Sequence, residues 1–513
     1  MKYIKNQSII LMIILFSSFI ITSCKNSTIE TNKNETTTSN ETETKETIKE
    51  YVTNNDVFVI DENSDKPKPN NGYPTNTPPG FVNPDGSIPG VPKNGGPAPV
   101  EKPETYTAVH TYDKSDTISN LKIESTGKDE NAILVDNKSN LIINKFDIKR
   151  ISSNSTGGDL ASFYGVGAAA LSIDGNLFMT DGRIETDSEG GAGVFAFENG
   201  IANLTDVNIT TRKDTSGGIH VAGGGTLSAK NVTATTDGNS SAAIRSDRGG
   251  GKMVVNGGTY TTNGVGSPAV YCTADITVDN AKLNSNNSEG ICIEGRNTTT
   301  LNNVDLTSNM HDDEQNDNTW SIIVYQSMSG DSEVGKGIFN MNGGSIKSSN
   351  GGIFYTTNTE SEFNINGVDI KNLSDSEFLL QVTGNTNKRG WGEAGKNGAK
   401  CTFNATNQVL EGDIICDSIS TLDLNLKGST MLTGNLIMND KFTGGVTGDG
   451  YVNVNMDENS MWIISQDMKM NKLTYKGEIV DDAYQIVPVY DTKGNLLIDG
   501  ISGLKITVDE LEE

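Results

Sequence analysis

The chain has 513 residues, a formal net charge of −26 and an aromatic content of only 6%. So large an acidic excess repels phosphates, which excludes nucleic acid as an expected partner. The length allows two or three domains or one elongated repeat domain, and no helical pattern of useful length follows the first 25 residues.

Residues 1–23 have the form of an export signal. Lys2 and Lys5 precede the apolar run SIILMIILFSSFI, which ITSC closes at Cys24. This ending resembles the bacterial lipobox, which implies cleavage before Cys24 and lipidation of its thiol. The alternatives are an ordinary signal peptide or a short anchor, although the run is short for a membrane span. We expect an exported protein that is lipid-anchored to the membrane and exposed at the cell surface.

Residues 24–105 are predicted to be a disordered linker. The first part is rich in Thr, Asn, Glu and Lys, and it has too few apolar residues to offset the entropy of ordering. Eleven of the chain's thirteen prolines then fall between Pro67 and Pro103. This composition is typical of an extended spacer, and a tail without a spacing role is the alternative.

From about Thr117 the sequence repeats in blocks of 23 to 25 residues. Each block has an alternating strand, a two-residue polar turn such as Lys230-Asn231, a short second strand, and an apolar-x-apolar triplet such as Ile219-His220-Val221. Alternation of period two indicates half-buried strands. The first strand ends in an apolar residue that we expect to face inward: Met179, Leu204, Ala229, Val255, Val278, Leu301, Met341 and Ile365.

This sequence repeat predicts an all-β fold, a right-handed parallel β-helix solenoid with about 23–25 residues per coil. An antiparallel sandwich would give no reason for the repeat. The blocks resemble the pectin-lyase-like superfamily, and in particular adhesin-like bacterial surface lipoproteins. ENSMWIISQDMKMNKLTYKG is similar to the segment that often closes such helices, with Asn459 in place of the expected glycine. We expect the parallel β-helix over 106–440 and a β-rich C-terminal cap over 441–513.

Stacking of the blocks predicts two outward columns of side chains. The first column contains Phe195, His220, Arg245, Tyr271, Cys292, Ile323 and Phe354. The second contains Phe197, Ala222, Asp247, Thr273, Glu294, Tyr325 and Thr356. Because neighbours in a column lie one coil apart, His220, Arg245, Asp247, Tyr271 and Glu294 are expected to share one solvent-exposed patch.

One hypothesis for this patch is polysaccharide cleavage. The resemblance implies a lyase or glycoside hydrolase that works from an outward strand, and the candidate residues are Asp247, Glu294, Arg245 and His220. Asp247 and Glu294 would lie roughly 9–10 Å apart, near the upper end of the separation in inverting glycosidases. No lyase or glycosidase carboxylate motif is present, however.

The preferred hypothesis is adhesion or carbohydrate binding without turnover. Aromatic side chains offer large contact areas with specific stacking geometry. The expected ligand-binding residues are Phe195, Phe197, His220, Arg245, Tyr271, Tyr325, Phe354, Trp320 and Trp391. The partner would be a surface glycan or a protein of a host or partner cell, and a purely structural envelope protein is a further alternative.

Four insertions interrupt the repeat, at 150–167, 310–320, 327–337 and 384–400. Insertions in a solenoid become loops, which commonly carry binding. Asp312, Asp313, Glu314 and Asp317 could hold Ca²⁺, but they lack the spacing of a known calcium loop. We therefore predict a solvated acidic loop there, with no required cofactor.

Overall fold

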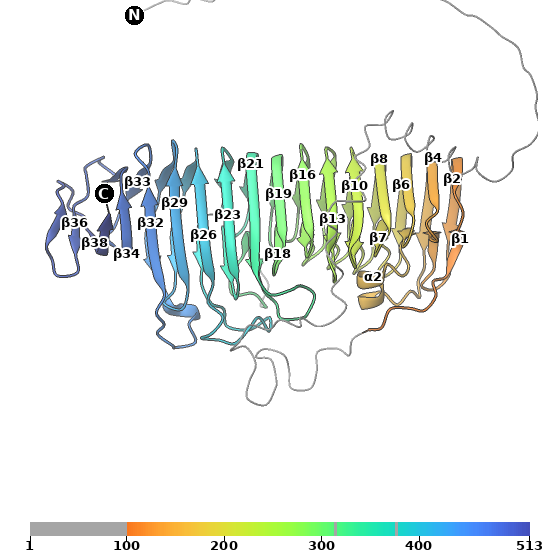
Figure 1. The fold of residues 1–513 in the computed structure, drawn as a ribbon, viewed down its shortest axis with the longest axis horizontal. Helices are drawn as coiled ribbons and strands as arrows, with labels where there is room; N and C mark the ends of the chain where they lie inside the picture. The colour runs from red at the N-terminus through yellow and green to blue at the C-terminus, as the bar shows by residue number, and fades with distance from the viewer. Residues whose placement is uncertain (1–99, 312–314, 375–377, 513) are drawn as a thin grey trace, which may run out of the picture. The chain divides into compact units, whose positions relative to one another are not determined.

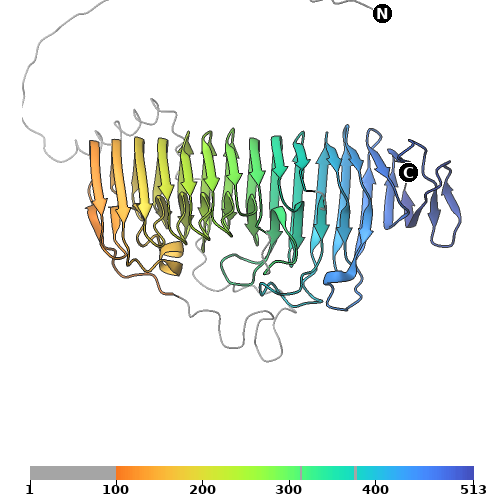
Figure 2. The same ribbon diagram turned by 180° about the vertical axis from the view of Figure 1, so that it is seen from behind.

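The computed structural model describes residues 100–311, 315–374 and 378–512, and this part is almost entirely β-structure. Its strands lie side by side in sequence order from β1 and β2 at one end as far as β34, and at the other end β38 lies between β34 and β36 (Figures 1 and 2). The predicted signal segment, Cys24 and most of the predicted linker lie outside the described residues.

Sheet A has thirteen strands, and each strand is parallel to the strands beside it. In order they are β1 (Ala108–Tyr112), β3 (Asn131–Val135), β5 (Ala170–Ser172), β7 (Val194–Phe197), β9 (Ile219–Ala222), β12 (Ile244–Ser246), β15 (Val270–Cys272), β18 (Ile291–Glu294), β20 (Trp320–Tyr325), β22 (Gly352–Thr357), β25 (Leu380–Val382), β28 (Ile414–Cys416) and β31 (Leu436–Met438).

Side chains of sheets A and B share one core, and sheet C is a smaller, four-stranded sheet in the C-terminal part. The strands of sheet B are β2 (Asp116–Ser125), β4 (Asn140–Ile151), β6 (Asn176–Asp187), β8 (Ile201–Thr211), β10 (Gly225–Lys230), β11 (Thr233–Thr236), β13 (Gly251–Asn256), β14 (Thr259–Thr262), β16 (Asp275–Asp279), β17 (Lys282–Ser285), β19 (Thr298–Ser308), β21 (Lys336–Ser348), β23 (Glu360–Asn366), β24 (Asp369–Asn372), β26 (Lys400–Thr406), β29 (Thr421–Lys427), β32 (Tyr451–Met456), β34 (Met468–Tyr475), β36 (Val489–Asp491), β37 (Leu496–Ile498) and β38 (Ile506–Glu512). Sheet C contains β27 (Val409–Glu411), β30 (Met431–Thr433), β33 (Met461–Ile464) and β35 (Glu478–Asp481). The helical segments are α2 (Gly158–Tyr164) and the 3₁₀ turn η1 (Asp440–Phe442).

Successive repeat blocks stack on one another through these parallel pairings. The predicted inward residues pair one with the next along sheet B, from Met179 with Leu204 to Met341 with Ile365, and all of them are buried. No block can bury its apolar face alone, so the stack forms one continuous core. The arrangement is consistent with a β-helix-like fold.

The polar residues of the repeat have two structural roles. Asn231 and Gly257, each second in its two-residue turn, have positive φ angles of 52° and 71°, a conformation that Asn and Gly tolerate. On the outer surface of sheet B, Asn amides bond to the same position one block away, as in Asn364 to Asn340 (2.9 Å) and Asn404 to Asn364 (2.7 Å). These bonds give a reason for asparagine at corresponding positions of successive blocks.

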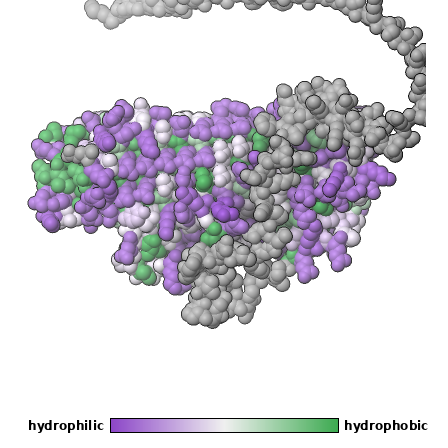
Figure 3. Space-filling view, viewed as in Figure 1, coloured by the Kyte–Doolittle hydropathy of each residue, from purple (hydrophilic) through white to green (hydrophobic). Residues whose placement is uncertain are grey.

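The C-terminal part continues the stack. Trp462 on β33 is fully buried, and its indole N–H donates to the carbonyl oxygen of Gly434 (2.8 Å). β36 and β37 form the one antiparallel pair of named strands in the described residues. Beside this pair, exposed apolar side chains gather at the end of the stack (Figure 3), and they include Tyr484, Leu496, Leu497 and Ile501.

Candidate functional site

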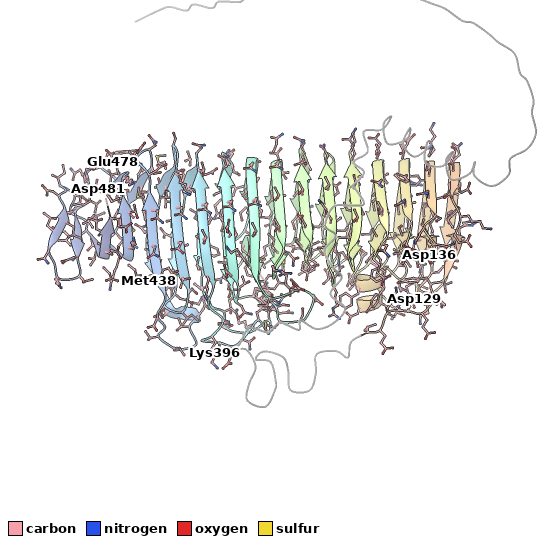
Figure 4. All side chains as sticks on the ribbon, viewed as in Figure 1. Asp129, Asp136, Lys396, Met438, Glu478 and Asp481 are labelled. Carbon is pink, nitrogen blue, oxygen red and sulfur yellow. The ribbon has the colours of Figure 1, made fainter. Side chains whose placement is uncertain are left out.

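The outer face of sheet A, which points away from the core, is covered over much of its length by other parts of the chain. The insertions project on one side of the stack, where Figure 4 labels Asp129 and Lys396. Residues 100–107 also lie on this face, where Lys102 pairs with Glu198 (2.7 Å) and the Tyr106 hydroxyl donates to the Tyr164 carbonyl. The end of the predicted linker, residues 100–105, is therefore docked on the fold.

The predicted solvent exposure of the outward columns is wrong. His220, Asp247 and Glu294 are only 1%, 3% and 1% exposed, and Arg245 is also buried. Four of the predicted aromatic binding residues are buried because the covering segments pack against them: Phe195, Phe197, Trp320 and Tyr325. Phe354 is also buried, but in the inner core. Tyr271 and Trp391 are half-buried. An exposed aromatic platform for glycans is therefore absent from this face as the structure describes it.

One member of the first column is also misplaced. Phe354 pairs with Ile322 and lies in the core, whereas Tyr355 pairs with Ile323 and points outward. Ile353, Phe354 and Tyr355 are three consecutive apolar residues, so their alternation is ambiguous. By the same shift, Thr357 pairs with Tyr325 in the second column, where Thr356 was expected.

The predicted grouping of charged residues does occur, as a buried network. Arg245 donates to Asp247 Oδ2 (2.9 Å), to the carbonyl oxygens of Ser216 and Ser240, and to Ser162 Oγ on α2 (2.9 Å). His220 Nε2 lies 3.5 Å from Asp247 Oδ2, and its ring stacks on Phe195 at 4.1 Å. Arg245 therefore joins α2 to sheet A.

The pKa values of His220 and Asp247 are both lowered, for different reasons. Burial lowers the pKa of His220 to about 4, although Asp247 opposes that shift. Burial also acts to raise the pKa of Asp247, but Arg245 and His220 outweigh it and the pKa falls below its usual value. At neutral pH the network therefore contains a neutral imidazole and one arginine–carboxylate pair.

Glu294 lies in a second buried polar group. Its carboxylate accepts hydrogen bonds from the hydroxyls of Tyr271 (2.8 Å), Tyr325 (3.0 Å) and Ser327. Burial raises the pKa of Glu294, and the nearby charge of Asp331 adds to this shift. Substrate cannot reach Asp247 or Glu294 in this arrangement, so neither carboxylate is placed for catalysis.

An open cleft lies at the corner where chain passes from sheet A to sheet B. Its volume is about 360 Å³, and it is lined by three successive turns, 248–251, 273–275 and 296–298, and by 330–333 of an insertion. The first and third turns are about 10 Å apart, since each coil adds about 4.8 Å. The cleft therefore extends along the stack.

Two ion pairs hold the insertion across this cleft. Arg248 Nη2 pairs with Asp331 Oδ1 (2.8 Å), and Arg296 pairs with Glu333. Ser332 Oγ donates to the Glu294 carbonyl oxygen (2.7 Å). The cleft is therefore formed before any ligand arrives, and two arginines face three carboxylates, including that of Asp275, within it.

Arg248, which lines this cleft, has one buried donor without a hydrogen-bond partner in the described part of the chain. Its guanidinium lies over the ring of Phe163 on α2, 4.1 Å from the centroid, and its Nε–H has no hydrogen-bond partner in the described residues. Burial raises the pKa of Asp331, with a further contribution from Asp247. The cleft thus presents both donors and acceptors in a partly desolvated setting.

The other two insertions meet over β20 and β22. Asp317 accepts hydrogen bonds from the backbone N–H of Thr386 (2.7 Å) and from its hydroxyl (2.6 Å), and Arg389 bonds Asn316 (3.2 Å). Beneath them lies an aromatic cluster of the outer face, whose members are Cys292, Met310, Trp320, Ile323, Tyr325, Tyr355 and Phe378, with Tyr271, Trp391 and Ile415 packed against it. Trp320 and Trp391, which both belong to insertions, therefore lie close together, with their ring centroids 6.2 Å apart.

The acidic calcium candidate is only partly described. Asp312, Asp313 and Glu314 lie outside the described residues. The carboxylate of Asp317 accepts a hydrogen bond from Thr386 and forms an ion pair with Lys388. Within residues 100–311, 315–374 and 378–512, no group of three or more His, Cys, Asp or Glu side chains is placed to hold a metal ion.

No protein-family model, curated protein or solved structure matches this chain. Within the described part, none of the helices has the length and apolar character needed to cross a membrane. Any statement on function therefore depends on the geometry of the outer face and its cleft.

Sequence reasoning missed the charged residues that line the cleft: Arg248, Arg296, Asp331 and Glu333. The repeat gave no signal for this pair, because the pairing of β12, β15 and β18 aligns Arg248 with Gly295 and not with Arg296. The insertion with Asp331 and Glu333 was recognised, but its partner on the coils could not be read from the repeat alone.

Proposed function

We propose that the protein is a lipid-anchored, surface-exposed adhesion or carbohydrate-binding protein, built on a right-handed parallel β-helix of the pectin-lyase-like kind, that does not turn its ligand over. The observation that carries this proposal is the polar cleft formed by residues 248–251, 273–275, 296–298 and 330–333. The lipid anchor at Cys24 and the spacer that follows it would present this cleft away from the membrane.

The chemistry of the cleft suits an uncharged polyhydroxyl ligand. Its two arginines are already paired with carboxylates, so an acidic ligand would have to displace Asp331 or Glu333. A sugar hydroxyl both donates and accepts, so it can bond an arginine N–H and a carboxylate oxygen of the cleft together. Hydrogen bonds to charged groups contribute about 1.5–3 kcal/mol each.

The burial of Asp247 and Glu294 supports binding without turnover, because hydrolysis needs carboxylates within reach of the scissile bond. Polysaccharide cleavage remains the second candidate function because one observation supports it. Asp331 lines the cleft with a raised pKa, and a general acid requires such a shift.

A glycan array probed with the purified full-length chain, followed by product analysis on each bound glycan, tests this proposal. We expect binding to uncharged glycans and no new reducing ends or unsaturated uronates. Product formation that disappears in Asp331→Asn would establish the enzyme instead. Absence of binding to any glycan would favour a protein partner or a purely structural envelope role.

A further inference from the structure

A second, smaller pocket lies on the outer face of sheet A, within the aromatic cluster. Its volume is about 50 Å³, and Trp320, Tyr325, Trp391 and Arg389 are among the residues that line it. The rings of Tyr325 and Trp391 are 4.4 Å apart between centroids, and those of Trp320 and Trp391 are 6.2 Å apart. Three aromatic rings therefore form its walls.

A buried donor at this pocket has no partner. Trp320 is 2% exposed, and its indole N–H makes no hydrogen bond to any residue that the structure describes. The comparable indole of Trp462 is bonded to the Gly434 carbonyl oxygen. Because an unsatisfied buried donor is unfavourable, an acceptor that enters beside Trp320 would recover much of this loss.

Size restricts what can enter. A water molecule needs roughly 10–15 Å³ of such space, so the pocket has room for about three or four groups of water size. A whole sugar ring is too large, but a substituent of a sugar fits. Glu289 also lines the pocket, which disfavours a negatively charged substituent.

We propose that this pocket binds the acetamido group of an N-acetylated amino sugar. The acetamido carbonyl oxygen would accept from the Trp320 indole N–H, and its methyl group would pack against Tyr325 and Trp391. Arg389 lies over Trp391, 5.5 Å from the ring centroid, and bonds Asn316 at the rim, where the hydroxyls of the sugar ring would lie.

The inference deepens the proposed function, on which it rests, by naming a ligand class. The pocket and the cleft have neighbouring walls, because the Tyr325 hydroxyl bonds the Glu294 side chain while Ser332 of the cleft bonds the Glu294 backbone. The pocket is nevertheless lined by different residues, so the two sites can be altered separately.

Isothermal titration calorimetry on the full-length chain tests the inference. The probes are N-acetylglucosamine and triacetylchitotriose, with glucose, glucosamine and N-acetyl-lysine for comparison. We expect the two acetylated sugars to bind at least about tenfold more tightly than glucose and glucosamine. Trp320→Phe keeps an aromatic ring but removes the pyrrole ring with its N–H, and it should weaken binding about tenfold. Trp462→Phe makes the same change away from the pocket and should leave the affinity unchanged.

Arg389→Ala is the second variant, because this exposed side chain can be removed without opening the core, and it should also weaken binding. Equal affinity for glucose, a response to N-acetyl-lysine alone, or full affinity in both variants would overturn the inference. Array binding of other glycans without any response to acetylated sugars would overturn it and leave the proposed function intact. Binding of no glycan at all would overturn both.

Discussion

Arg248 and Asp331 are 83 residues apart in the chain, and a 2.8 Å ion pair joins them across the cleft. The same guanidinium lies over Phe163 of α2. One side chain therefore contacts two insertions, 150–167 and 327–337, and helps to keep the outer face of sheet A closed. The four predictions that follow test this closure, the buried network beneath it and the stacking of the coils.

The Arg248–Asp331 pair should show measurable coupling. In a double-mutant cycle with Arg248→Gln and Asp331→Asn, we expect a coupling free energy of about 1 kcal/mol, since both side chains are half-buried. Urea unfolding measures it. Arg183 and Asp147 form a more exposed pair at 3.0 Å, and the same cycle there should give a coupling near zero. Equal coupling for both pairs would contradict a role for Arg248 in closure.

Removal of Arg245 should be strongly destabilising. Arg245→Met leaves Asp247 buried without its counter-ion, and the expected loss in free energy of unfolding is about 3–5 kcal/mol. The double variant Arg245→Met/Asp247→Leu removes both charges and should recover most of that loss. Thermal unfolding followed by circular dichroism provides the measurement. A mild effect of the single variant would mean that the network is hydrated and open.

His220 should make stability depend on pH in a defined window. Its folded pKa of about 4 lies below the usual 6.5, because burial disfavours the imidazolium. Between these values the unfolded chain takes up a proton that the folded chain does not, so the free energy of unfolding falls as pH falls. The stabilisation is fully present above about pH 6.5, and its loss amounts to at most about 3 kcal/mol by pH 4.

His220→Phe should remove this part of the pH dependence. Glu294 and Asp331, whose pKa values are raised, act in the opposite direction, but they are present in both proteins. The difference between wild type and variant in urea unfolding at pH 7 and pH 4.5 therefore isolates the imidazole. An identical difference at both pH values would show that His220 titrates normally.

Close stacking of the turns should make Gly225 sensitive to substitution. A Cβ atom at Gly225 would collide with the backbone carbonyl of Ala196 on the preceding coil, so Gly225→Ala should lower the melting temperature by several degrees. Gly343 has a positive φ of 62° but nothing within 4 Å of its Cβ position. Gly343→Ala should cost only about 1 kcal/mol. Equal tolerance at both positions would contradict the stacking.

The inward half of each coil could be predicted from the sequence. Met179, Leu204 and their counterparts repeat every 23 to 25 residues in most blocks. Because these residues are buried, apolar and polar residues alternate along the strand, and this alternation can be seen in the sequence. The turn residues were equally readable, because Asn and Gly at fixed positions reveal left-handed backbone.

The outer face could not be predicted in the same way. The repeat places His220 and Arg245 in one column, but it contains no information on where an insertion such as 150–167 will fold. Long-range contacts such as Arg245 with Ser162, 83 residues apart, decide the burial of that column. The predicted position of Phe354 was wrong for a different reason, since three consecutive apolar residues leave the register of the strand undetermined.

The most direct test of the account is glycan binding by a cleft variant. Arg296 lines the cleft, is 66% exposed and pairs with Glu333, so Arg296→Ala should leave the fold intact. Arg183, which is 55% exposed and pairs with Asp147 away from the cleft, provides the matched control. On the same array, the account predicts about a tenfold loss of binding for Arg296→Ala and none for Arg183→Ala. Equal binding by the two variants would contradict the assignment of the cleft.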